Sequence, residues 1–265
     1  MKPLVSIVIP VYNSGAYLPE TIASVNKQTY ENIELIIVDN SSDDEHTIAY
    51  LKEIQEKYKV LYTGRTGVAA ARNVAIKKAK GEYILALDSD DIIKPPFVEK
   101  CIEQMQKDST VSVVRTQVEL FGKKSGTIKF PSYDFSVLLA RNLMVVTSLF
   151  KREDWERIGG FDADFILGFE DWEYWINLLK DGGKVATIEE PLFRYRIRKE
   201  SRNSSLKQKD FKLLRRQIWD KHKDLYATYF VDPTESFEYK FIEESTANKV
   251  GNLLMKPFMS LKLMK

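Results

Sequence analysis

The sequence predicts an α/β protein whose mixed, mainly parallel sheet lies between layers of helices, with a helical extension at its C-terminus. Apolar, β-branched runs at residues 4–10, 33–38 and 83–87 have the composition of strands buried on both faces. Helical patterns joined by short links separate these runs, as in a doubly wound sheet. Asp39 and Asp88 directly follow two of the strands. Ligands of such sheets bind at the carboxyl ends of the strands.

The first half of the chain alternates strands with helices. After the strand at residues 4–10, a helix is expected with Leu18, Ile22 and Val25 facing inward. The elements that follow are a strand at 33–38, a helix carrying Ile48, Leu51 and Ile54, a strand at 60–62, a helix at 68–80 and a strand at 83–87.

The second half departs from this alternation. Helices are expected at 96–106, 132–141, 152–158 and 170–180, and strands at 111–120, 144–150, 185–188 and 192–197. Polar amphipathic helices are expected from about residue 206. The predicted organisation is one domain at 1–200, with halves at about 1–95 and 96–200, followed by the extension at 201–265.

Charge and residue content exclude several function classes. Lys and Arg total 40 and Asp and Glu total 38, so bulk charge does not favour binding to nucleic acid. Cys101 is the single cysteine, which excludes an internal disulfide and a thiolate metal site. With only His46 and His222, a histidine-rich metal centre is excluded as well. No transmembrane-length run or secretory leader is evident, so a cytoplasmic location is expected.

The strand at residues 83–87 runs directly into three carboxylates, Asp88, Asp90 and Asp91. Like charges at this spacing repel one another unless a cation neutralises them. Carboxylate oxygens suit Mg²⁺ or Mn²⁺, and these ions often keep substrate phosphates as further ligands. The stretch predicts a metal site that holds a phosphorylated substrate. Taken alone, it is equally compatible with a solvated turn before the next helix.

Two further stretches could carry chemistry. Gly67 begins an alanine-rich segment containing Arg72, where a helix N-terminus and a cation could meet a diphosphate; a packed helix with a surface arginine is the alternative. Glu170 and Asp171 begin a helix beside Trp172. Acids among aromatic rings suit a sugar and a general base, whereas the simpler interpretation is a carboxylate cap that stabilises the helix dipole.

Taken together, these stretches resemble the inverting GT-A glycosyltransferases of the family 2 type. The resemblance covers roughly residues 3–198. It rests on six motifs in matching order and spacing, at residues 5–13, 38–43, 67–73, 87–91, 159–162 and 169–171. It implies the GT-A (Rossmann-like) fold, with a nucleotide half first and an acceptor half second.

The resemblance also implies roles for individual residues. The nucleotide-sugar would contact Pro10, Val11, Tyr12, Asn13, Asp39, Gly67, Arg72, Asp88 and Ser89. Asp39 would bond the base. Asp88 and Asp90 would form the DXD pair, with Asp90 as the direct metal ligand. Asp171 would be the catalytic base, and Glu170 and Trp172 would lie beside the acceptor.

The activity implied by the resemblance is transfer of a hexosyl group, with inversion, from a nucleotide-sugar to an acceptor hydroxyl. A UDP-sugar is the expected donor, Mn²⁺ or Mg²⁺ the expected cofactor, and a glycan or lipid-linked molecule the expected acceptor, in bacterial surface polysaccharide biosynthesis. A non-catalytic nucleotide-sugar-binding protein on the same fold is the alternative. A phosphotransfer enzyme is disfavoured because the chain lacks a Walker-type phosphate loop.

The chain departs from the family pattern at residues 194–198, where many members carry a histidine that helps to hold metal or diphosphate. This leaves the full set of metal ligands open, and Arg198 or Lys199 could contact the diphosphate instead.

The tail lies outside the resemblance. It carries Lys249, Lys256, Lys262 and Lys265 beside the apolar Val250, Leu253, Leu254, Phe258 and Leu261. Such a basic amphipathic end could lie on the inner face of an anionic membrane. Packing on its own domain, or on a partner subunit in a homo-oligomer, is the alternative.

Overall fold

The structure is a computed structural model that describes residues 2–199, 206–230 and 245. Its nine strands form one mixed sheet in the order β3-β2-β1-β4-β8-β6-β9-β5, with β7 paired to β6. The first four strands in this order run parallel. Their bounds are Lys59–Tyr62 for β3, Ile33–Asp39 for β2, Val5–Val11 for β1 and Tyr83–Ala86 for β4. This half of the sheet is the doubly wound part that the sequence predicts.

The rest of the sheet mixes the two orientations. Strand β8 is antiparallel to both β4 and β6, β9 is parallel to β6, and the short β5 and β7 are antiparallel to their partners. The bounds are Ile92–Ile93 for β5, Val111–Gly122 for β6, Gly126–Ile128 for β7, Leu149–Lys151 for β8 and Lys184–Ile197 for β9. Because β9 ends near β5, it brings its last residues beside the acidic loop after β4.

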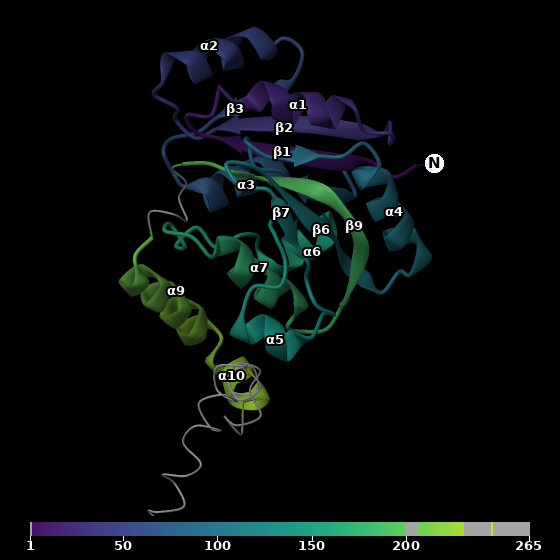
Figure 1. Cartoon of the computed structure of the whole chain (residues 1–265), viewed down its shortest axis with the longest axis vertical. Helices are drawn as coiled ribbons and strands as arrows, with labels where there is room; N and C mark the ends of the chain where they lie inside the picture. The colour runs from purple at the N-terminus through teal and green to yellow at the C-terminus, as the bar shows by residue number, and fades with distance from the viewer. Residues whose placement is uncertain (1, 200–205, 231–244, 246–265) are drawn as a thin grey trace, which may run out of the picture.

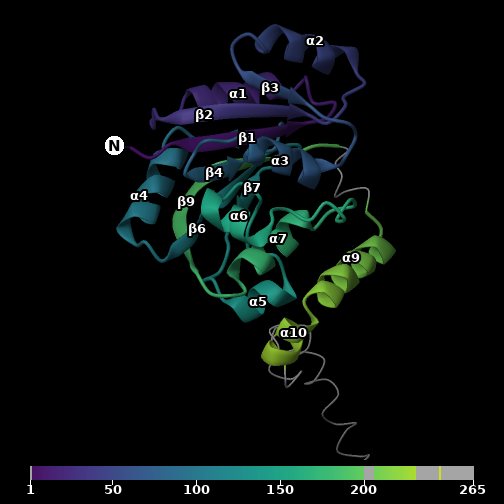
Figure 2. The same cartoon turned by 180° about the vertical axis from the view of Figure 1, so that it is seen from behind.

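Helices cover both faces of the sheet and bury two apolar clusters. Helices α1, α2 and α4 contribute to one cluster, and α3, α5, α7 and α9 to the other. Their bounds are Leu18–Asn26 for α1, Glu45–Ile54 for α2, Val68–Lys77 for α3, Phe97–Lys107 for α4, Phe135–Ala140 for α5, Arg152–Ile158 for α6, Glu170–Leu179 for α7, Gln208–Lys221 for α9 and Lys223–Tyr229 for α10. Figure 1 shows α2 at one end of the molecule and α5 and α10 at the other. Seen from behind, α9 again lies beside α7 (Figure 2).

The predicted fold class is confirmed, but one strand prediction in the second half is wrong for most of its length, and two other predicted strands are parts of a single strand. The strand predicted at 144–150 is only β8, and the residues before it form a loop in which Asn142 Oδ1 accepts a hydrogen bond from the Met144 backbone N–H at 3.1 Å. The strands predicted at 185–188 and 192–197 are one strand, β9. Shifts in its register with β6 accommodate Pro191, because a proline cannot donate a ladder hydrogen bond.

The C-terminal helical segment packs on the domain that precedes it. Leu214 and Ile218 of α9 are buried in the same apolar cluster as Trp175 of α7. The predicted basic amphipathic tail at 246–265 lies outside the described residues. Within the described part of the chain, no helix combines the length and apolar content needed to cross a bilayer.

Candidate active site

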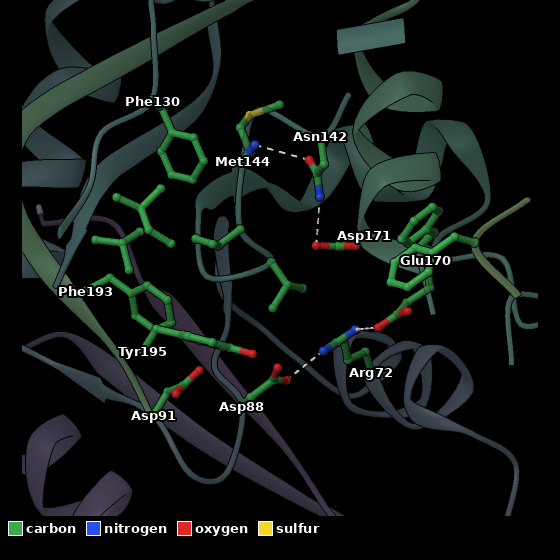
Figure 3. A pocket seen from close by; sticks show the side chains of 16 residues that line it. Arg72, Asp88, Asp91, Phe130, Asn142, Met144, Glu170, Asp171, Phe193 and Tyr195 are labelled. Atoms are coloured by element: carbon green, nitrogen blue, oxygen red, sulfur yellow. Dashed lines mark hydrogen bonds and ion pairs between the residues drawn. The ribbon is translucent and has the colours of Figure 1, made fainter. Parts of the chain in front are cut away.

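Two cavities meet where the two halves of the sheet join. Cavity A, about 580 Å³, opens at the carboxyl ends of β1 and β4, and cavity B, about 400 Å³, lies among β6, β9 and α7. Arg72, Asp88 and Tyr195 line both of them. Figure 3 shows these three side chains along one side of cavity B, with Asp171 and Glu170 on another. A molecule bound in cavity A would therefore lie within reach of a molecule bound in cavity B, with one shared wall between the two cavities.

Cavity A contains most of the residues predicted to bind a nucleotide-sugar. Its lining includes Pro10, Tyr12, Gly67, Arg72, Asp88, Ser89 and Asp90, together with Asn40, Arg65, Arg196 and Arg198. Gly67 has φ +87°, a conformation that favours glycine, and α3 begins directly after it. The guanidinium groups of Arg65, Arg196 and Arg198 suit an anionic ligand such as a diphosphate.

Three residues that are expected to contact the nucleotide-sugar form hydrogen bonds within or between neighbouring loops. The Asp39 carboxylate accepts hydrogen bonds from the Ser42 hydroxyl at 2.6 Å and the Ser42 backbone N–H at 3.1 Å. Asn13 Oδ1 accepts from the Asp43 backbone N–H at 2.9 Å, and the Val11 carbonyl accepts from the Asn40 backbone N–H at 2.8 Å. These bonds shape the loops after β1 and β2, and Asn40, which sequence reasoning missed, reaches the cavity itself.

Arg72 bridges two carboxylates in the shared wall. Its side chain is 1% exposed, with Nη2 at 2.6 Å from Asp88 Oδ1 and Nη1 at 2.9 Å from Glu170 Oε1. Burial alone would lower the pKa of Arg72, but the two carboxylates outweigh that effect and raise the pKa above its ordinary value. Neither interpretation from the sequence anticipated this: Arg72 is not a surface arginine, and its charge is engaged by protein carboxylates. Glu170 is likewise buried, so its observed role is to pair with Arg72.

The acidic loop after β4 is held by the end of β9. The Arg196 backbone N–H donates to Asp91 Oδ1 at 2.8 Å, and Arg196 Nε donates to the Asp90 carbonyl at 2.7 Å. Arg198 Nε lies 2.9 Å from Asp90 Oδ2. Burial and the charge of Asp88 raise the pKa of Asp90, although both arginines oppose the rise. Burial and the charges of Asp90 and Asp88 raise the pKa of Asp91 well above its usual range.

The donor set of this loop fits a hard divalent cation. Asp88 and Asp90 both line cavity A, and their oxygens are of the type that Mg²⁺ and Mn²⁺ prefer. Burial is the largest cause of the raised pKa values of Asp90 and Asp91, and the charges of neighbouring carboxylates add to it. Among the described residues, no group of three or more His, Cys, Asp or Glu side chains is arranged around one metal position. An ion here would therefore take two protein carboxylates and complete its shell with ligand oxygens.

Asp171 lies on the far side of cavity B from the aromatic residues of β9. Its Oδ2 accepts a hydrogen bond from Asn142 Nδ2 at 3.0 Å, which fixes the plane of the carboxylate (Figure 3). Phe169, just before α7, has φ +65°. This conformation is uncommon for a residue with a Cβ, and it directs the start of α7, with Glu170 and Asp171, into the cavity.

Trp172 does not lie where the sequence predicts. Its side chain is 3% exposed, and its indole N–H donates to the Leu138 carbonyl at 2.6 Å. The aromatic residues that line cavity B are instead Phe130, Phe169, Phe193, Tyr195 and Phe211. Asn142 and these rings come from elements far apart in the chain, and of them only Phe169 belongs to one of the six motifs.

Comparisons with known proteins bear on the family and the fold of this chain. The family model described as Glycosyl transferase family 2 matches residues 6–142. The putative teichuronic acid biosynthesis glycosyltransferase TuaG of Bacillus subtilis is 30% identical over 242 residues, which cover 89% of this chain and 94% of TuaG. Glycosyltransferase GlyG of Streptococcus pneumoniae is 42% identical over 118 residues, 43% of this chain and 39% of that relative.

Solved structures show the same fold. S. aureus TarS in complex with UDP-GlcNAc has a TM-score of 0.69 at 19% identity, over 93% of this chain and 77% of that chain. The mannosyltransferase PcManGT from Pyrobaculum calidifontis, in complex with GDP-Man and Mn²⁺, has a TM-score of 0.60 at 21% identity, over 88% of this chain and 65% of that chain.

Proposed function

Because the chain belongs to glycosyl transferase family 2, we propose that it transfers a sugar from a nucleotide-sugar in cavity A to an acceptor hydroxyl in cavity B. The observation that carries this proposal is the shared wall of Arg72, Asp88 and Tyr195. A donor whose diphosphate lies at Asp88 would place its sugar at the junction of the cavities. The acceptor would then approach from the side of Asp171.

The donor is proposed to be a UDP-sugar. The nucleoside would lie along Pro10, Tyr12 and Asn13, with Asp39 near the base and Val11, Gly67 and Ser89 beside the donor. Arg65 stands 4.7 Å from the centre of the Tyr12 ring at the edge of the same cavity. TarS binds UDP-GlcNAc on this fold, which supports testing UDP-sugars first.

A divalent cation, Mn²⁺ or Mg²⁺, held by Asp88 and Asp90, would supply the positive charge that stabilises the departing nucleoside diphosphate. Among this chain's own residues, Arg196 holds the acidic loop by its backbone and side chain. Arg72 holds Asp88 in place through the 2.6 Å ion pair.

Asp171 is proposed to be the catalytic base. Asn142 orients its carboxylate, which can take the proton of an acceptor hydroxyl as that oxygen bonds to the anomeric carbon. The bond from the anomeric carbon to the diphosphate oxygen breaks in the same displacement, and the electron pair leaves with the diphosphate. One displacement through an oxocarbenium-like transition state inverts the anomeric centre and requires no enzyme nucleophile.

The acceptor is proposed to be a glycan or lipid-linked saccharide of the bacterial surface. The name of TuaG, which aligns over most of this chain, points to polysaccharide biosynthesis as the setting.

The proposal is tested by measuring nucleotide release and nucleotide binding with UDP-, GDP- and dTDP-sugars, each with Mn²⁺, Mg²⁺ or EDTA. We expect nucleotide release from a UDP-sugar, and we expect EDTA to abolish this release. Binding of the nucleotide-sugar without transfer to any bacterial glycan preparation would favour a binding protein. Failure of every nucleotide to bind would contradict the assignment of cavity A.

A further inference from the structure

Helix α9 is joined to the helix that carries Asp171 by contacts to one buried carboxylate. Glu173 of α7 is fully buried, and its Oε1 lies 2.9 Å from Lys221 Nζ and 3.0 Å from His222 Nε2. Lys221 Nζ also lies 2.6 Å from Asp162 Oδ2. A buried carboxylate is unfavourable unless it is paired. The end of α9 therefore has a fixed position on α7.

The rest of α9 is fixed along its length. Leu214 and Ile218 are 1% and 0% exposed within the apolar cluster beneath the helix. Gln217 Nε2 donates to the Asp164 carbonyl at 3.2 Å. Both views show α9 lying beside α7 (Figures 1 and 2). The segment is thus a structural wall of the domain, and the side chains at its first turn have defined positions.

Phe211, near the start of α9, lies on the same helix face as Leu214 and Ile218 but, unlike them, is partly exposed. Its side chain is 39% exposed and lines cavity B together with Asp171 and Asn142. Its ring centre is 5.9 Å from that of Phe169, which itself packs 5.2 Å from Trp172. A large apolar ring that is left exposed beside a catalytic carboxylate is suited to cover part of a ligand.

We infer that Phe211 binds the acceptor, and that α9 is the element of this chain that selects it; this rests on the proposed use of cavity B as the acceptor site. The chemical class is a saccharide ring. Its apolar C–H face would stack on Phe211, and its hydroxyl edge would reach Asn142 and Asp171. A purely hydrocarbon ligand would bring no hydroxyl to Asp171.

The test is saturation-transfer NMR with UDP and Mg²⁺ present, on the full chain. The probes are the methyl α- and β-glycosides of glucose, galactose, mannose and N-acetylglucosamine. We expect at least one glycoside to bind, and Phe211→Ala to weaken its affinity roughly three- to tenfold, the value of one aromatic contact. Phe211→Trp should retain binding. Leu213→Ala is the matched control, since Leu213 is 57% exposed on the same helix but does not line cavity B.

UDP affinity, measured on the same samples, separates this inference from the proposed function. It should be equal in the wild type and all three variants. Glycoside binding that is unchanged in Phe211→Ala would overturn the inference, as would a wild type that binds UDP but none of the glycosides. A wild type that binds neither UDP nor a glycoside would overturn both the inference and the proposed function.

Discussion

Cavities A and B lie side by side but are built from different parts of the chain. More than half of the residues that line cavity A are charged or polar, and they lie at the ends of parallel strands, where short consecutive stretches of sequence supply its acids. Cavity B is lined largely by aromatic and aliphatic side chains, with Asp91, Asn142, Glu170 and Asp171 as the polar groups outside the shared wall. Most of its lining residues come from six separate segments between β6 and α9, and Arg72, Asp88 and Asp91 come from the first half of the chain. Cavity A suits a charged part of a substrate that does not vary, and cavity B suits a part of a substrate that varies.

This difference indicates which interactions serve the chemical step and which determine the choice of substrate. Ion pairs and hydrogen bonds hold every acid of cavity A, as in the bridge from Asp88 through Arg72 to Glu170. In cavity B, packing positions the rings, and small changes in shape would alter which ligand fits. Substitutions in the two cavities should therefore have separable effects on donor and acceptor.

The largest effect is expected where cavity B supplies chemistry. Asp171→Asn keeps the hydrogen-bonding shape but cannot accept the acceptor's proton, so sugar transfer should fall by about 10³-fold. UDP binding, measured by calorimetry, should not change, because Asp171 does not line cavity A. Asp164→Asn, at an exposed acid on the preceding loop, is the control. Normal transfer by Asp171→Asn would place the base elsewhere.

Substitutions in the shared wall should lower the stability of the protein as well as its activity. Arg72→Met leaves the buried Glu170 and the half-buried Asp88 without their cation, and should lower the free energy of unfolding by about 3–5 kcal/mol. Urea denaturation measures this loss. Adding Glu170→Gln to Arg72→Met should restore part of the stability, because it removes the buried charge. If Arg72→Met left the free energy of unfolding unchanged, the bridge between Asp88 and Glu170 would not stabilise the fold.

The smallest effect is expected at the edge of cavity A. Arg198 pairs with Asp90 at 2.9 Å, and both side chains are partly exposed. Because a cation and Arg198 would compete for this carboxylate, Arg198→Ala should raise the affinity for Mn²⁺ alone by about two- to fivefold, the worth of an exposed ion pair. Calorimetric titration with Mn²⁺ measures it, and Asp90→Asn is the negative control. Weaker Mn²⁺ binding in Arg198→Ala would show that Arg198 supports the ion site.

The contrast between the cavities also explains what could be predicted from sequence. The strand-end acids Asp39, Asp88 and Asp90 and the helix-start acid Asp171 follow local patterns, so their positions could be inferred without a structure. Trp172 was misplaced because its ring turns into the core, which depends on the carbonyl of the distant Leu138.

Long-range contacts explain what local patterns missed. The ion pair between Arg72 and Glu170 could not be inferred because the two residues lie 98 positions apart. The strand predicted at 144–150 failed because an apolar run alone cannot distinguish a strand from a buried loop. Its residues Val145 and Val146 instead line cavity B. Sequence patterns thus described cavity A well and cavity B poorly.

The most direct test of the account is a crystal structure of the protein with UDP and Mn²⁺. The account predicts electron density for the diphosphate and one ion at Asp88 and Asp90 within cavity A, with cavity B and Asp171 left accessible beside it. Density for the nucleotide in cavity B, or a diphosphate bound away from Asp88 and Asp90, would contradict the division of the site into donor and acceptor cavities.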